Sequence, residues 1–79
     1  MKFSFRLDHI NLNVTVKGHT KEAAENATVV VDECCDVESI GAPVETSDGT
    51  FVAVIAVRTG NDLHKVDEVL SAVHRIANT

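Results

Sequence analysis

The side chains in this sequence that could bind a metal or take part in redox or acid–base chemistry are two adjacent cysteines, Cys34 and Cys35, and four histidines. Zinc sites and dithiol redox sites usually place two residues between their cysteines, so adjacent thiols match neither pattern. His64 and His74 fall in one helical pattern, but their spacing does not bring them onto a common face. No nucleophile stands beside a base in a recognisable motif. We therefore predict a protein that is not an enzyme, with no metal and no cofactor, whose cysteines are buried small side chains.

Acidic residues gather in one part of the chain. The span from Glu22 to Val57 contains no Lys or Arg, and its acids crowd the end of an expected helix, where the helix dipole disfavours negative charge. A break of a local rule can mark a functional site. Three interpretations stay open: docking on a basic partner protein, a carboxylate site for a divalent metal, or a solvated face that only aids solubility. The candidate partner surface comprises Asp32, Glu33, Asp36 and Glu38.

Charge and composition exclude several classes of protein. Seven basic residues against twelve acidic ones give a net charge of −5, which argues against direct binding to nucleic acid or to anionic membranes. No apolar run is long enough for a membrane helix, and the first residues do not resemble a signal peptide. Together with two thiols, these features predict a cytoplasmic protein. The length predicts a single α+β domain over residues 1–79.

The first part of the chain reads as two strands and a helix. Apolar residues alternate through residues 3–16 in two phases, and the phase changes at Asp8-His9. A two-residue turn there would make a hairpin that pairs Leu7 with Ile10; a single strand with a bulge is the other possibility. Helical spacing of small apolar residues follows over about residues 20–35, with Thr20 as the N-cap.

The second part repeats strands and a helix. A weak strand over residues 37–46 contains Pro43, which confines it to a sheet edge. Residues 51–58 form the strongest strand, and a second helix begins with Asn61 or Asp62 as its cap. The predicted order is ββαββα, in a two-layer sandwich with both helices on one face of a four-stranded, mainly antiparallel sheet. This arrangement resembles a variant of the ferredoxin-like sheet.

Residues from Gly49 through Val57 to Ile76 also resemble the strand–helix half of ACT-type regulatory domains. That resemblance implies a small-molecule-binding regulatory domain, with its ligand near residues 18–21. We keep this as the alternative function.

The strand over residues 51–58 supplies the main functional prediction. Arg58 should face solvent, so alternation puts Val54 and its neighbours in phase on the same outer side. Two helices cover only one sheet face, which leaves these side chains either as an interface or as ordinary scattered surface residues. We predict a non-catalytic interaction domain of the adaptor or inhibitor type, a homodimer or larger homo-oligomer through the open sheet face, whose acidic surface suits a basic partner protein. The predicted interface residues are Asn11, Asn13, Thr15, Val52, Val54 and Ala56.

Overall fold

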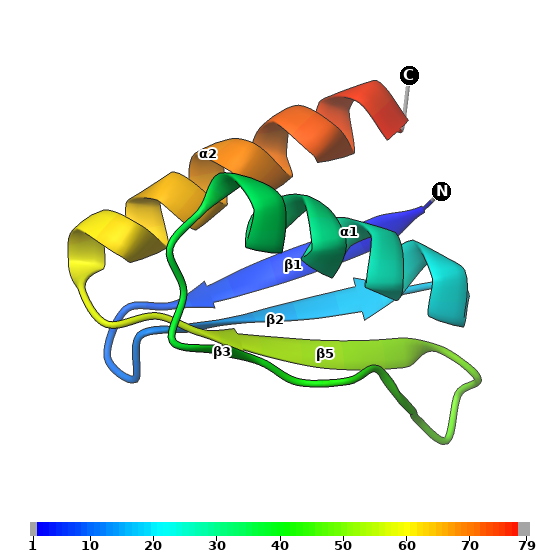
Figure 1. Cartoon of the computed structure of the whole chain (residues 1–79). Helices are drawn as coiled ribbons and strands as arrows, with labels where there is room; N and C mark the ends of the chain where they lie inside the picture. Colours follow the sequence, from blue (N-terminus) through cyan, green and yellow to red (C-terminus); the bar gives the residue numbers. More distant parts are fainter. Residues whose placement is uncertain (1, 78–79) are drawn as a thin grey trace.

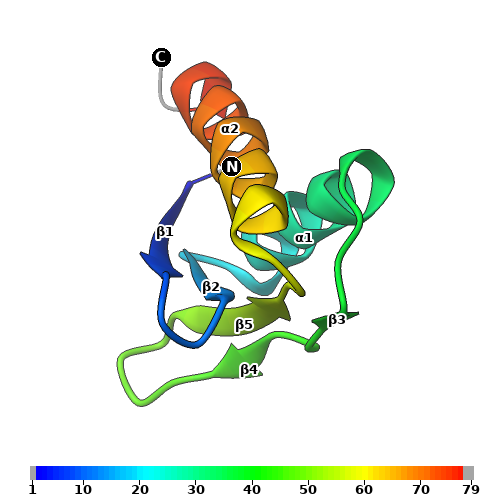
Figure 2. The ribbon, with the colours of Figure 1, turned by 90° about the vertical axis from the view of Figure 1, so that its left-hand side faces the viewer.

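The computed structural model describes residues 2–77 as a sheet covered on one side by two helices (Figure 1). The helices lie over the same face of the sheet, and the view along the sheet edge shows no helix beneath it (Figure 2). The elements are β1 (Phe3–Asp8), β2 (Asn13–Gly18), α1 (Lys21–Cys34), β3 (Ser39–Ile40), β4 (Val44–Glu45), β5 (Phe51–Ala56) and α2 (Gly60–Ala77).

The sheet is antiparallel throughout, with the order β1-β2-β5-β3, and β4 also pairs with β5. The predicted α+β class, with an antiparallel sheet and two helices, is therefore confirmed. The predicted count of four strands is not, because the sheet has five. The single edge strand expected over residues 37–46 is divided into β3 and β4.

A bulge explains this division. Ile40 lies opposite Ile55, and Val44 lies opposite Val52, so the edge gains one residue relative to β5 between these pairs. Pro43 lies in the extra stretch and has no N–H to donate to the ladder. One inserted residue reverses which face the side chains occupy. Ile40 consequently packs against the core, whereas Val44 points outward and is 65% exposed.

The first two strands form a hairpin and not a single bulged strand, but the predicted register of the hairpin is wrong. Leu7 lies opposite Val14 rather than Ile10, and Phe5 lies opposite Val16. A loop of residues 9–12 replaces the expected two-residue turn. Ile10, which the tight turn would have made a core residue, is 92% exposed in that loop.

Asp8 determines the shape of the loop. Its Oδ1 accepts hydrogen bonds from the backbone N–H groups of Ile10 at 3.0 Å and Asn11 at 2.9 Å. A short polar side chain that bonds its own backbone in this way closes a turn without glycine. The loop leaves through Leu12, whose φ of 54° lies in the left-handed region. The backbone N–H of Asn11 lowers the pKa of the Asp8 carboxyl, so Asp8 is charged at neutral pH.

The first helix begins at its predicted cap and lies very close to the sheet. Thr20 Oγ1 accepts a hydrogen bond from the Ala23 backbone N–H at 3.1 Å. The side chains that face the sheet are mostly small, and Ala24 and Ala27 have no exposed surface. A Cβ added to Gly18 would lie only 2.6 Å from the Ala24 backbone nitrogen. Only glycine leaves enough room for the helix at this point.

The second helix begins earlier in the chain than predicted, at Gly60. Thr59 Oγ1 accepts a hydrogen bond from the Asp62 backbone N–H at 3.1 Å, so Thr59 caps α2 instead of Asn61 or Asp62. Threonine competes well for this position because its hydroxyl reaches the free amides of the first turn. The buried core joins both helices to the sheet and consists of Phe3, Val14, Val16, Ala27, Val31, Ile55, Val57, Leu63, Val66 and Leu70.

Replacing Gly18 with alanine should strain the contact between α1 and β2. We expect Gly18→Ala to lower the free energy of unfolding by about 1–3 kcal/mol, the usual range for overpacking. Urea unfolding followed by circular dichroism measures the difference. Gly60→Ala is the matched control, because nothing lies within 4 Å of the added Cβ, and it should leave stability equal or slightly higher. Equal behaviour of the two variants would contradict the steric explanation.

Candidate interaction surfaces

The open face is the side of the sheet turned away from both helices (Figure 2). β5 contributes Val52, Val54 and Ala56 to it, and Val54 is 45% exposed. β2 places Thr15 opposite Val54 and Asn13 opposite Ala56. The structure therefore brings five of the six predicted interface residues together on this face. They form an aliphatic row beside a polar row.

Two corrections apply to the predicted membership of the open face. Asn11 does not belong to it: β2 begins at Asn13, and Asn11 lies in the hairpin loop, where its Nδ2 donates to Asp8 Oδ2 at 2.9 Å. Val44 belongs to it, opposite Val52. Alternation with Ile40 would have put Val44 on the buried side, and the bulge reverses that placement. The sequence signal for the bulge was Pro43 within an otherwise alternating strand.

A polar turn between β4 and β5 borders the open face. Asp48 Oδ1 accepts from the Thr50 backbone N–H at 3.0 Å and from Thr50 Oγ1 at 2.6 Å, and Thr46 Oγ1 also donates to it. Asp48 Oδ2 pairs with Lys17 Nζ at 3.3 Å. The hydrogen bond from the Thr46 hydroxyl has the largest effect on Asp48, and the hydroxyl and backbone N–H of Thr50 come next. Together they hold the pKa of Asp48 far below its usual value. This turn fixes Lys17 beside the aliphatic row, since Lys17 lies opposite Val52.

The acidic residues lie where α1 ends and the chain returns to the sheet. Asp32 and Glu33 are exposed on the last turns of α1, and Asp36 and Glu38 follow the helix. Asp36 pairs with Arg58 at 3.4 Å. Within residues 2–77 the other three acids form no salt bridge, so their charge is available to a partner.

The metal interpretation finds no support in this geometry. A metal site formed by Asp32 and Asp36 at helical i, i+4 spacing would need both carboxylates on one helix face, but α1 ends at Cys34. In the described part of the chain, no group of three or more His, Cys, Asp or Glu side chains is placed to hold a metal ion.

A shallow hollow of about 410 Å³ lies between α1 and the edge strand β3. Its walls combine aliphatic side chains with acidic ones, and one of the aliphatic residues, Val29, is half exposed. The acidic surface is thus continuous with apolar surface. The lining residues are Thr28, Val29, Asp32, Val37, Glu38, Ser39 and Ile40.

The two cysteines differ in environment. Cys35 packs partly against the core, and burial raises the pKa of its thiol. Cys34 is exposed at the end of α1, which corrects the expectation that both thiols are buried. The reason is that Cys34 occupies the outer side of the last helical turn, and the stripe facing the sheet ends with Val31 and then Cys35.

A second hollow, of about 380 Å³, lies at the beginning of α1, where the alternative function placed a ligand. Thr20 already occupies one of the free backbone donors of the helix, and the carboxylate of Glu22 adds negative charge. The close approach of α1 accounts for Gly18 without any ligand. The lining residues are Lys2, His19, Thr20, Glu22, Ala23 and Asn26.

Comparison with known proteins returns no match to a family model, to a curated protein or to a solved structure. Neither of the described helices has the length and apolar character that crossing a membrane requires.

Asp48→Asn should destabilise the protein at neutral pH and lose this effect in acid. Asparagine keeps the size of the side chain but loses the charge that Lys17 and the threonine hydroxyls stabilise. Because folding lowers the pKa of Asp48, its contribution is complete above the unfolded value of about 3.9 and disappears as the pH falls through the folded value. The difference between the urea midpoints of the two proteins should be full at pH 7 and shrink steadily as the pH falls from about 4 to 2. A constant difference across this range would show that charge is not the cause.

Proposed function

We propose that this chain is a small non-catalytic protein–protein interaction domain, built on a ferredoxin-like two-layer frame, that self-associates through its open face. The observation that carries the proposal is the aliphatic row of that face. Val44 and Val54 are 65% and 45% exposed, and no helix within residues 2–77 covers them. Exposed valines are ordinary when scattered, but a contiguous row on an uncovered sheet favours association.

The layout of the open face suits sheet-on-sheet packing. Two sheets that pack face to face lie about 10 Å apart, and their inner side chains interdigitate. Small side chains such as Val52 and Val54 allow that spacing, and Val44 extends the row towards the sheet edge. The polar row of Asn13 and Thr15 would form one side of the interface rim. An apolar centre with a polar rim is the usual anatomy of such contacts.

The acidic surface supports a second contact, with a basic partner protein. Asp32, Glu33 and Glu38 carry unpaired charge at the C-terminal end of α1, where the helix dipole adds further negative potential. Charge of one sign steers a partner of the opposite sign and sets specificity more than affinity. A domain with one self-associating face and one acidic face fits an adaptor or an inhibitor.

The ACT-like alternative depends on the hollow at the start of α1. An amino-acid ligand there would stabilise the folded state and raise the melting temperature. The interaction function requires no such ligand. A carboxylate would bind weakly in this hollow, because Glu22 is itself negatively charged and the Ala23 N–H already donates to Thr20. We therefore favour the interaction function.

Val54→Asp should dissociate the self-association through the open face while the fold persists. A carboxylate at the centre of the aliphatic row would be buried without a partner in the assembly, whereas in the monomer it faces solvent. We expect the dissociation constant to rise at least about tenfold, measured by light scattering over a dilution series. Ile10→Asp is the control, since Ile10 is exposed in the hairpin loop away from the face. A wild-type monomer at millimolar concentration would refute the proposal.

Neutralising the acidic surface should weaken binding to a basic probe. The triple variant Asp32→Asn, Glu33→Gln, Glu38→Gln should bind a fluorescent octalysine peptide at least about threefold more weakly than wild type at low salt. The matched control removes the same charge elsewhere, by Glu22→Gln, Glu25→Gln and Glu68→Gln. Equal losses in both triple variants would show a response to net charge alone and would remove the acidic surface from the proposed function.

A further inference from the structure

One long edge of the sheet has its backbone unpaired. β1 pairs with β2 on one side only, and nothing else in residues 2–77 joins the sheet beyond it. The bond from the His19 N–H to the Lys2 carbonyl, at 3.1 Å, shows which residues face β2. Even-numbered residues of β1 therefore bond inward, and the N–H and C=O groups of Phe3, Phe5 and Leu7 point out of the sheet.

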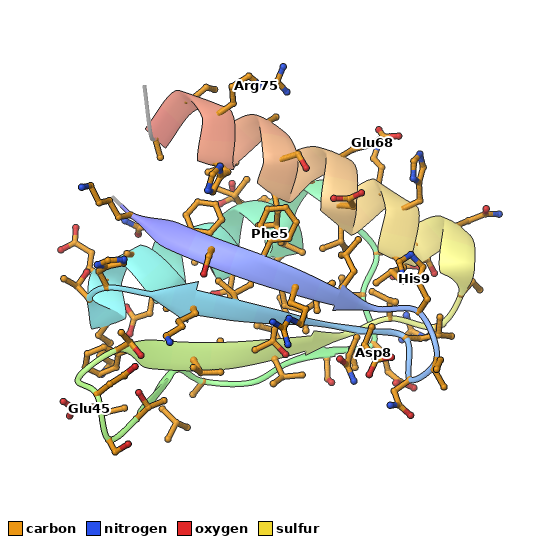
Figure 3. All side chains as sticks on the ribbon, turned by 180° about the vertical axis from the view of Figure 1, so that it is seen from behind. Phe5, Asp8, His9, Glu45, Glu68 and Arg75 are labelled. Carbon is orange, nitrogen blue, oxygen red and sulfur yellow. The ribbon has the colours of Figure 1, made fainter. Side chains whose placement is uncertain are left out.

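The two edges of the sheet differ sharply in how they are protected. The far edge consists of two short strands, interrupted by a bulge and by Pro43, and these devices prevent a further strand from pairing. β1 contains six residues without proline, glycine or bulge. The side chains of β1 that face the core lie beneath α2, and Phe5 is on this side of the strand (Figure 3). The rings of Phe5 and His74 lie 6.3 Å apart. Phe5 stays partly exposed beside the free edge.

The sequence of β1 is complementary to itself in one antiparallel register. If Phe5 lies opposite Phe5 of a second copy, Phe3 meets Leu7, and on the open-face side Ser4 meets Arg6 and Lys2 meets Asp8. Aromatic pairs and opposite charges across strands stabilise such a pairing. A slip of two residues in one direction opposes Arg6 with Arg6, and a slip in the other opposes Lys2 with Arg6. Like charges disfavour both slips.

We infer that two copies of this chain pair edge to edge through β1, about a two-fold axis at Phe5, to form one continuous antiparallel sheet. The occupant of the edge is a second copy because the charge pattern of β1 fits itself in a single register. This contact is isologous, so it closes as a dimer and leaves no further long edge exposed. It uses the edge of the sheet, whereas the function proposed above uses its open face, and the two contacts are independent.

Disulfide trapping tests both the contact and its register. Residues directly opposite in a non-hydrogen-bonded antiparallel pair have Cα atoms about 4.5 Å apart, within the range that a disulfide accepts. In a background of Cys34→Ser and Cys35→Ala, Ser4→Cys chains are oxidised alone and in a mixture with Arg6→Cys chains. We expect the mixture to give a cross-linked heterodimer, identified by its mass, and Ser4→Cys alone to stay largely monomeric on a non-reducing gel. The cysteine-free background is the control.

Each other outcome overturns the inference. Cross-linking of Ser4→Cys with itself would indicate a slipped register, because this variant keeps Lys2 and Arg6, and no heterodimer in the mixture would exclude edge pairing. Adding Val54→Asp to both chains separates this contact from the open-face contact. Edge pairing predicts that the heterodimer still forms, because Val54 lies off the edge on β5. Loss of the cross-link with Val54→Asp would assign it to face-to-face packing instead.

Discussion

The close contact between α1 and β2 is the constraint on which the rest of the structure depends. Gly18 has no side chain, and Ala24 of α1 lies directly against it with no exposed surface. Because the helix lies so low, α1 and α2 cover one face of the sheet as a continuous layer, and both contribute to the same buried core. Residues 2–77 contain no further element over the other face. With both helices on one side, the other face of the sheet stays open in the described part of the chain.

The spacing of apolar residues in the sequence correctly predicted the features that depend on which side chains are buried. The two helices, the cap at Thr20 and the buried side of β5 all follow from where apolar side chains recur. The outward placement of Val52 and Val54 came from the same alternation, anchored by Arg58. Each of these features is dictated by the need to cover apolar area, which a linear sequence displays directly.

Features set by local backbone geometry were harder to predict. The hairpin register depends on Asp8 bonding the amides of its own loop and on Leu12 adopting a positive φ; alternation gives no sign of either. The bulge before Val44 moved one valine from the buried side to the open face. Asn11 does not lie on the open face, because the hairpin loop is longer than a tight turn and includes this residue. One residue of register decides which face a side chain occupies, and this is where sequence reasoning failed.

The distribution of charge explains how an acidic chain can associate with itself. A dimer doubles the net charge of −5, and such charge opposes assembly when it lies at the contact. Here the unpaired acids lie at the end of α1, whereas the open face carries Arg6 and Lys17, and Lys17 is neutralised by Asp48. Lys2 and Asp8 similarly put opposite signs at the two ends of β1. The surfaces suited to self-association are thus close to neutral, and the remaining negative charge stays free to attract a basic partner.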